Sequence, residues 1–328
     1  MTSSIGKFSR RIFSASLVSG AFLAREGHSQ TWPGNNPVSL VIPYSAGGGT
    51  DILGRVVADK LSKDTGGNVV LLHKPGAVTS IAARYVAKAP PDGQTILLGS
   101  VVTFCMAPWS LKTPGFDTDK DFEHITMIAE SMYLLVVNSK WSNLEKLVDE
   151  AKKRPGELSF ASWGIGSTAH LFMLDLMART GINLIHVPYG GSQPALTDVI
   201  GGRIDIMMCP QATAAQHVLS GRLTGLAVLN NSRVASMPKI PTIEEIGLRG
   251  LRSPGWLSLQ VPSGTPSSIV QTIGELAKTA FKNPATRLML ERSGMGDVEF
   301  GSENLKNRIK ADSIFYRELM ARAGVVPE

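Results

Sequence analysis

Residues 38–51 read Val38-Ser-Leu-Val-Ile-Pro-Tyr-Ser-Ala-Gly-Gly-Gly-Thr-Asp51. An apolar strand runs into a glycine-rich corner, and apolar residues then recur at helical spacing, which predicts a helix beginning near Thr50 or Asp51. A strand, a tight turn and a helix N-terminus aim several unpaired backbone N–H groups at one point, and such a point attracts an anion. The alternative is a sharp turn whose glycines only relieve backbone strain. This stretch alone leaves both interpretations open.

A second loop, at residues 158–170, repeats this pattern. It runs from a strand through Gly164 and Gly166 to a helix capped by Ser167 or Thr168. Ligands of open α/β sheets bind outside the carboxyl ends of the strands, where both loops are expected to lie. Two such loops in different halves of the chain therefore predict a ligand held between two lobes.

The first 30 residues have the pattern of an export signal. The pair Arg10-Arg11 precedes a modestly apolar run that is too short to span a bilayer. The pair also resembles a twin-arginine signal, although arginine pairs are common in ordinary signals and the export route stays open. We expect cleavage near Ser29-Gln30, with Ala24 as the alternative, and a soluble, periplasmic mature protein.

Charge and cysteine content exclude several classes of protein. The chain has 33 basic and 27 acidic residues, and removal of residues 1–29 leaves 29 and 26. This mild balance, without basic runs or interleaved aromatic residues, gives no support to nucleic-acid binding. Cys105 and Cys209 are too few for a disulfide scaffold and lack metal-ligand spacing, so we expect no metal and no cofactor. Whether the two thiols pair stays open, with two small buried residues as the favoured interpretation.

The mature chain is long enough for two lobes. It alternates strand-like and helical stretches, which is typical of an α/β protein with parallel sheets covered by helices. The expected strands after the first are 69–73, 95–99, 125–128, 134–137, 159–161, 185–187 and 204–208. Helices are expected after Asn143, from Ser192 to the Gly201-Gly202 pair, and at 267–281, 284–293 and 302–323.

An ordered series of short motifs covers nearly the whole mature chain. The motifs are Trp32-Pro33, the 43–51 corner, Lys74-Pro-Gly-Ala77, Pro91-Asp-Gly93, Leu97-Leu-Gly-Ser100, Asp121-Phe122, Ser162-Trp-Gly-Ile-Gly-Ser167 with His170, His186-Val-Pro-Tyr-Gly190, Asp198-Val-Ile-Gly-Gly-Arg-Ile-Asp205, Pro241-Thr-Ile-Glu-Glu-Ile-Gly247, Trp256 and Pro262-Ser-Gly-Thr-Pro266. The series resembles the Bug-type periplasmic receptors, which are the solute-binding components of tripartite tricarboxylate transporters.

The resemblance implies a two-lobed periplasmic-binding-protein (Venus flytrap) fold with two interlobe crossovers. The first lobe would hold residues 31–131 plus 254–328, and the second residues 132–253. Family members bind carboxylates in the cleft between the lobes. By motif, the ligand-binding residues would be Tyr44, Ser45, Ala46, Gly47, Gly48 and Asp51, with Ser100, in the first lobe, and Gly164, Gly166, Ser167, Thr168 and His170 in the second. Tyr189, Gly190 and Asp205 match segments that approach the same cleft.

The implied function is receipt of a small carboxylate and its delivery to the large and small membrane subunits of a tripartite transporter. We expect a monomer. Two departures from the family pattern bear on the cargo: Gly76-Ala-Val-Thr79 replaces a glycine-rich segment, and Gly190 stands where a lysine is common. A mono- or dicarboxylate is therefore favoured over a tricarboxylate. Trp163 could stack on an aromatic cargo or pack against its own lobe.

Two other classes of protein compete with the receptor. An exported α/β hydrolase would need a nucleophile with a base, and Ser167 with His170 has that spacing, but the spacing equally suits a helix cap. Neither a Gly-x-Ser-x-Gly corner nor a phosphate-binding loop is present, so we expect no enzyme. A ligand sensor for a membrane signalling partner shares the fold. Asp51 could contact a ligand amine or cap its own helix.

Overall fold

The computed structural model describes Met1 and residues 32–46, 49–229, 233–234, 236–253, 255–292 and 294–327. The expected export signal therefore falls outside the described residues. Residues 32–328 form one compact α/β unit with two sheets. Among the helices described, none is both long and apolar enough to cross a membrane.

The first sheet, sheet A, has six strands in the order β11-β4-β10-β3-β1-β2. Its strands are β1 (Val38–Ile42), β2 (Val69–His73), β3 (Thr95–Ser100), β4 (Phe122–Ser131), β10 (Trp256–Pro262) and β11 (Met295–Gly296). Its helices are α1 (Gly49–Thr65), η1 (Ala77–Thr79), α2 (Ser80–Ala87), η2 (Val102–Met106), α3 (Ala107–Ser110), α8 (Ser267–Lys282), α9 (Pro284–Arg292) and α10 (Ser302–Arg322).

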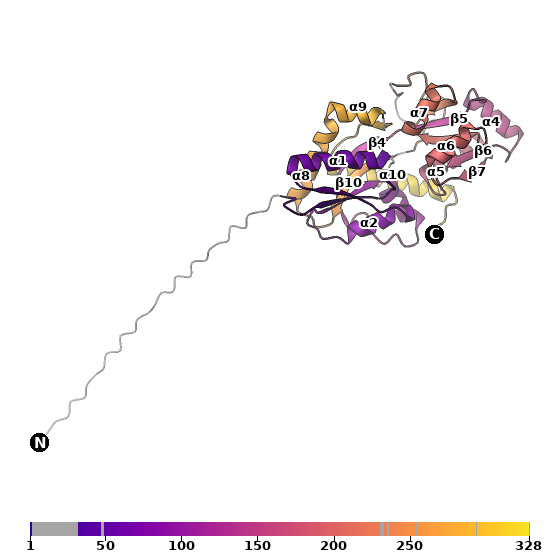
Figure 1. The fold of residues 1–328 in the computed structure, drawn as a ribbon. Helices are drawn as coiled ribbons and strands as arrows, with labels where there is room; N and C mark the ends of the chain where they lie inside the picture. Colours follow the sequence, from indigo (N-terminus) through magenta and orange to yellow (C-terminus); the bar gives the residue numbers. More distant parts are fainter. Residues whose placement is uncertain are drawn as a thin grey trace. The chain divides into compact units, whose positions relative to one another are not determined.

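Side chains of sheet A alternate between two apolar layers, as the period of a strand requires. Leu40 and Ile42 pack with α1, α8 and α9 on one face, and Val41 packs with α2, η2 and α10 on the other. Figure 1 shows α1 and α8 on one side of these strands and α2 on the other. The inner strands β1 and β3 are buried on both faces, so they read as nearly continuous apolar runs in the sequence.

The second sheet, sheet B, has five strands in the order β7-β6-β8-β5-β9. Its strands are β5 (Tyr133–Asn138), β6 (Ser159–Ser162), β7 (Ile185–Pro188), β8 (Ile206–Pro210) and β9 (Leu223–Val228). Its helices are α4 (Leu144–Lys153), α5 (Thr168–Thr180), α6 (Ser192–Ile200) and α7 (Gln211–Leu219). Helices α4 and α5 cover one face, and α6 and α7 cover the other. The two-lobed α/β fold is confirmed.

The expectation of purely parallel sheets is wrong for five strand pairs. β1 pairs in parallel with β2 and β3, as β6 does with β7 and β8. The pairs of β10 with β3 and β4, of β11 with β4, and of β5 with β8 and β9 are antiparallel. β5 and β10 are the first strands reached after the chain passes from one sheet to the other, and each enters its sheet against the direction of its neighbours.

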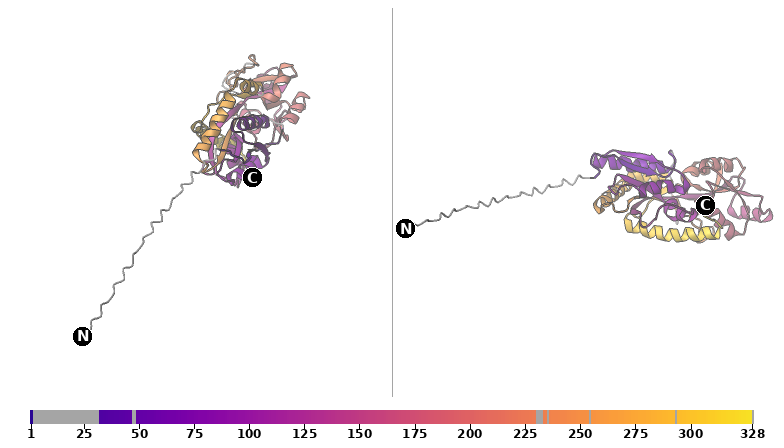
Figure 2. Two further views of the ribbon diagram at one scale, coloured as in Figure 1. Left: turned by 60° about the vertical axis from the view of Figure 1, so that its left-hand side comes forward. Right: turned by 90° about the horizontal axis from the view of Figure 1, so that it is seen from below.

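The chain passes between the sheets at Met132 and again between β9 and β10. The lobe boundaries predicted at 131/132 and 253/254 lie in these two links and stay a prediction. Helix α10 runs past sheet A and reaches α5 of the second sheet, as the right-hand view of Figure 2 shows. At its far end Arg322 forms an ion pair of 3.7 Å with Asp175 of α5. Helix α10 thus contacts both sheets.

Candidate binding site between two loops

The corner after β1 is the first half of the candidate site. Tyr44 is half-buried, Ser45 and Ala46 are exposed, and Gly47 and Gly48 lie outside the described residues. Helix α1 begins at Gly49, one or two residues before the expected start. The predicted strand and helix are therefore present on either side of the corner.

Behind this corner, four hydroxyl groups form a chain of hydrogen bonds. The hydroxyl of Tyr44 lies 2.9 Å from Ser100 Oγ, Ser100 Oγ lies 3.2 Å from Thr103 Oγ1, and Thr79 Oγ1 lies 2.9 Å from Thr103 Oγ1. Burial, opposed by the bond to Ser100, raises the pKa of Tyr44 to about 12, so this phenol stays protonated at neutral pH. The chain joins three segments that the sequence separates. Thr79 and Thr103 were missed as site residues because only the fold brings them beside Ser100.

The segment at Val78 and Thr79 has an unusual backbone. Ala77, Val78 and Thr79 have φ values of 44°, 50° and 69°, in the left-handed region that disfavours branched side chains. Thr79 takes the N-cap position of α2, but its hydroxyl bonds to Thr103 and to the carbonyl of Val78 instead of capping the helix. Such strain persists only where surrounding contacts hold it. The sequence predicts a helix here with Thr79 or Ser80 as its cap; Thr79 takes that position, but its hydroxyl does not cap the helix.

Asp51 is buried in the first turn of α1 and has protein partners. Its carboxylate oxygens lie 2.8 Å from His73 Nε2 and 3.2 Å from Arg55 Nη2. These contacts tie α1 to the end of β2. They give Asp51 a structural role, which is a third possibility beside the ligand contact and the helix cap considered from the sequence.

The loop between β6 and α5 is the second half of the candidate site. Gly164 and Gly166 have φ values of 128° and 73°, which favour glycine, and a methyl group added at either would meet nothing within 4 Å. Ser167 is the N-cap of α5, and its hydroxyl accepts a hydrogen bond of 3.3 Å from the amide of His170. The capping interpretation of the Ser167–His170 spacing is therefore the one observed.

Several amides of this loop are used within the loop itself. The amide of Gly164 donates to Ser162 Oγ, that of Gly166 to the ring of His170, and that of Ser167 to the carbonyl of Gly164. Within the described part of the chain, no partner is found for the amides of Ile165, Thr168 and Ala169. The last two are the first N–H groups of α5, which an intact helix leaves unpaired. Of these three residues only Thr168 was predicted from the motif, and Ile165 and Ala169 lie next to predicted residues.

Two aromatic side chains lie at the end of sheet B where β6 ends and β5 begins. The ring of Trp163 stacks on that of Tyr133 at 6.1 Å between centroids, and the hydroxyl of Tyr133 lies near Ser131 and Thr168. Tyr133 also contributes slightly to the raised pKa of Tyr44, so it lies near the first-lobe corner. Tyr133 directly follows the crossover at Met132, a position that could have indicated its place between the loops. A stacking role of Trp163 toward cargo stays a prediction.

The remaining predicted residues lie in different places. Tyr189 follows β7, its amide donates to Ser162, and its hydroxyl donates to Asp198 at 2.7 Å. Gly190 has open space beside it. Asp205 precedes β8 and accepts from the amide of Ser159, the first residue of β6. It therefore lies at the amino ends of β6 and β8, whereas the candidate loop lies at the carboxyl end of β6.

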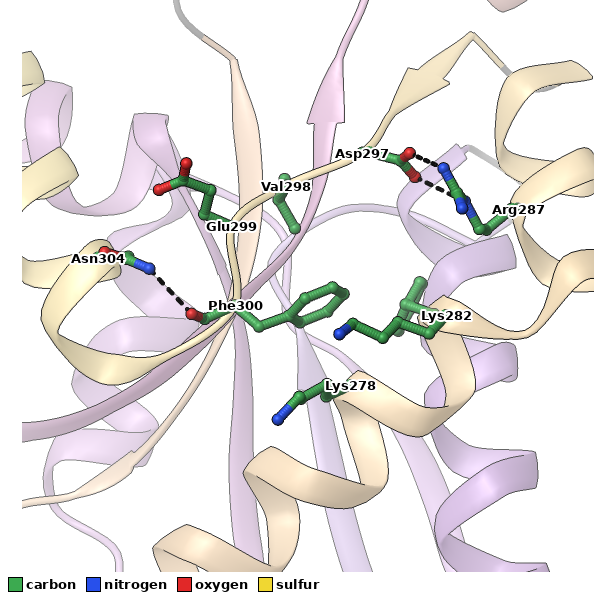
Figure 3. Close-up of a pocket in the computed structure, with 9 residues that line it drawn as sticks. Lys278, Lys282, Arg287, Asp297, Val298, Glu299, Phe300 and Asn304 are labelled. Carbon is green, nitrogen blue, oxygen red and sulfur yellow. Dashed lines mark hydrogen bonds and ion pairs between the residues drawn. The ribbon is translucent and has the colours of Figure 1, made fainter.

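The described hollows lie elsewhere, around the extended segment 297–300. One has a volume of about 390 Å³ beside Lys278, Lys282 and Phe300. Figure 3 shows the ring of Phe300 at its centre, with Arg287 paired to Asp297 at the rim. A second hollow of about 630 Å³ adjoins it toward Glu130 and α10. Neither contains a residue predicted to bind cargo.

The described side chains include no group of three or more His, Cys, Asp or Glu residues that could hold a metal ion. Cys105 in η2 and Cys209 in β8 are both buried free thiols. Burial raises the pKa of both thiols, which keeps them protonated and unreactive. The favoured interpretation of two buried residues agrees with these positions.

Comparison with known proteins identifies the family. The profile of the "Tripartite tricarboxylate transporter family receptor" matches residues 53–323. The chain belongs to this family of transport receptors. It is similar to Protein BugT of Bordetella pertussis, with 31% identity over 276 residues, covering 82% of this chain and 84% of the relative.

Two solved structures of relatives carry carboxylates. Rpa4515 of R. palustris, described with adipate, is 29% identical with a TM-score of 0.82, over 90% of this chain and 100% of that chain. MatC of Rhodopseudomonas palustris, described with bound malate, is 25% identical with a TM-score of 0.75, over 86% of this chain and 98% of that one. The resemblance to Bug-type receptors and the receptor fold are confirmed.

Proposed function

We propose that the protein is a periplasmic receptor that binds a small mono- or dicarboxylate between the two loops and delivers it to the membrane subunits of a tripartite transporter. The observation that carries the proposal is the set of three unpartnered amides at Ile165, Thr168 and Ala169. Hydrogen bonds to a charged acceptor contribute about 1.5–3 kcal/mol each. Three such bonds hold a carboxylate firmly and still permit its release.

The proposed receptor acts without chemistry on its cargo. Ser167 and His170 are engaged in capping and holding their own loop, which leaves neither as a free nucleophile or base. A ligand that touches both loops favours the closed arrangement by its difference in affinity for the two states. Export through a signal at residues 1–30, action as a monomer, and docking on a large and a small membrane subunit belong to the same proposal.

A thermal-shift screen tests this function. The mature chain is unfolded and refolded to remove carried ligand, and is then mixed with aliphatic mono-, di- and tricarboxylates, acidic amino acids and aromatic acids. A ligand at 100 times its Kd adds about 2.7 kcal/mol to the free energy of unfolding. A shift from one class of carboxylate supports the proposal, and a shift from aromatic acids alone indicates stacking on Trp163. A folded protein that responds to none of them contradicts it.

A backbone variant locates the binding amides. Ala169→Pro removes one N–H from the first turn of α5, where proline is tolerated. Ser268→Pro makes the same change in the first turn of α8, which packs against sheet A, and is the matched control. We expect only Ala169→Pro to weaken cargo binding, by about tenfold for a loss of 1.4 kcal/mol. Circular dichroism checks that both variants are folded, and equal affinities would place the cargo elsewhere.

A further inference from the structure

Three nearly parallel rings lie together on one face of sheet B, beside the second loop. Phe160 of β6 pairs in register with His186 of β7, and their ring centroids are 4.7 Å apart. The ring of His170, in the first turn of α5, lies 4.2 Å from that of His186 and is tilted by 19°. The two imidazoles thus form a stacked pair.

Each imidazole has a hydrogen-bond partner in the loop. His170 Nδ1 accepts a bond of 3.1 Å from the amide of Gly166. His186 Nε2 lies 2.7 Å from Ser162 Oγ, which itself accepts 3.1 Å from the amide of Gly164. Ser162 Oγ also lies 3.0 Å from the carbonyl of Gly164, to which its hydroxyl can donate. His170 is therefore an acceptor for the amide of Gly166, whereas the direction of the bond between Ser162 and His186 depends on the tautomer of His186.

These bonds determine which amides of the loop remain for a ligand. The two rings, one directly and one through Ser162, engage the amides of Gly166 and Gly164. The intervening amide of Ile165 and the first amides of α5 have no partner among the described residues. The amide of Gly166 keeps its partner only while His170 offers an acceptor nitrogen.

Protonation of His170 would remove this acceptor. An imidazolium has N–H groups at both nitrogens, so a charged His170 would turn an N–H toward the N–H of Gly166. No ion pair to either ring is found among the described carboxylates, and the groups packed around the rings are uncharged: Phe160, Ser162 and the loop backbone. Burial, and then His186, lower the pKa of His170 to about 4, and burial lowers the pKa of His186. Both rings are therefore neutral at neutral pH.

We infer that His170 is a positioning residue of this loop, which as a neutral ring stacked on His186 holds the loop's free amides toward the cargo and on protonation releases both loop and cargo. The inference deepens the proposed function and rests on it for the identity of the cargo. The holding of the loop can be tested without any cargo.

The first experiment measures hydrogen exchange of the Gly166 amide by NMR in the cargo-free protein. His170→Asn places an amide oxygen near the position of Nδ1 and keeps the acceptor, whereas His170→Phe keeps a stacking ring and removes it. We expect slow exchange in the wild type and in His170→Asn, and exchange at least about tenfold faster in His170→Phe, for the loss of one hydrogen bond. Equal exchange in all three proteins overturns the positioning role.

The second experiment measures the Kd of malate and of adipate by calorimetry from about pH 7 to about pH 4, the range in which these imidazoles titrate. The double variant His170→Asn with His186→Gln keeps an acceptor at residue 170 and has no titrating ring in the stack, so it reports the titration of the probe itself. At pH 4 about half of the His170 rings are protonated in the cargo-free protein, so we expect the wild type to lose about twofold more affinity than the double variant over this range. His217→Gln, on α7, is the histidine control and should follow the wild type.

The outcomes separate the two proposals. Parallel pH profiles of the wild type and the double variant overturn release by protonation. If neither probe binds and the thermal-shift screen finds no carboxylate, the proposed function fails while the exchange experiment still decides the positioning role. Circular dichroism at each pH distinguishes release of the loop from unfolding of the chain.

Discussion

The carboxylate of Asp312 accepts a hydrogen bond of 2.9 Å from the indole Nε1 of Trp256, and both side chains are fully buried. Trp256 is the first residue of β10, which the chain reaches through the second crossover. Asp312 also accepts from Arg308 at 2.7 Å, and Arg308 bonds in turn to Glu130, next to the first crossover. One helix, α10, thus fastens the sheet-A ends of both crossovers.

Removal of the Asp312 carboxylate should destabilise the protein strongly. Asp312→Ala leaves the indole N–H of Trp256 without its acceptor and the half-buried guanidinium of Arg308 without one of its two carboxylate partners. Breaking a buried charged pair costs about 3–5 kcal/mol, and we expect a loss near the lower value because Arg308 keeps Glu130. Urea unfolding measures it. Glu318→Ala, at an exposed position of the same helix, should change stability by less than about 0.5 kcal/mol, and equal losses would contradict the assigned role.

The strained valine at position 78 gives a second prediction. A left-handed conformation costs an L-residue roughly 1–2 kcal/mol, which Val78→Gly relieves, while the added freedom of the unfolded chain opposes the gain by up to about 1 kcal/mol. Val78→Gly should therefore leave the free energy of unfolding unchanged or raise it slightly. Val70→Gly, at an exposed position in β2, should lower it by about 1 kcal/mol. Similar losses in both variants would show that Val78 is not strained.

Stability should fall as the pH decreases from 6.5 toward 4. Burial lowers the pKa of His124, as it does for His170 and His186, below the ordinary histidine value of 6.5. The unfolded chain then binds protons in a range where the folded chain does not, so protonation favours unfolding. The contribution is complete above pH 6.5 and is lost toward the folded pKa, which for His170 is about 4. Urea midpoints across this range test the sign; a midpoint that rises on acidification would contradict it.

The alternation of strands and helices could be predicted from the sequence, but β9, β10 and β11 were missed. β10 reads Trp-Leu-Ser-Leu-Gln-Val-Pro and every residue in it is buried. Its polar side chains are buried too, and Gln260 donates a hydrogen bond of 2.6 Å to Ser258, so polarity along the strand does not reflect exposure. β9 carries a glycine at its centre, and β11 has only two residues. Local patterns are weak in all three.

The two loops of the site could also be predicted, since glycines and helix caps are local signals. Which amides remain for a ligand could not, because that depends on partners distant in the sequence. His186 lies 24 residues from Ser162 and reaches it only through the pairing of β6 with β7. Asp205 was expected near the cleft from its motif alone, and its place before β8 puts it at the amino ends of β6 and β8.

A glycine in the link from α9 to β11 provides the last prediction. Gly294 has a φ of +69°, and a methyl group added there would lie 2.6 Å from the amide nitrogen of Ala212 and 2.9 Å from Cβ of Gln211. These residues begin α7, which covers sheet B, whereas Gly294 precedes a strand of sheet A, so the contact joins the two halves of the fold.

Gly294→Ala must displace backbone atoms, and overpacking of this kind costs about 1–3 kcal/mol. Gly324→Ala is the matched control, because Gly324 has a φ of +65° and nothing within 4 Å of the added methyl group. Both variants carry the same conformational cost, so the difference between their urea unfolding free energies isolates the contact between the halves. We expect Gly294→Ala to be the less stable by about 2 kcal/mol, within the range for overpacked sites. Equal stabilities would mean that α7 and the α9–β11 link are not in contact in solution.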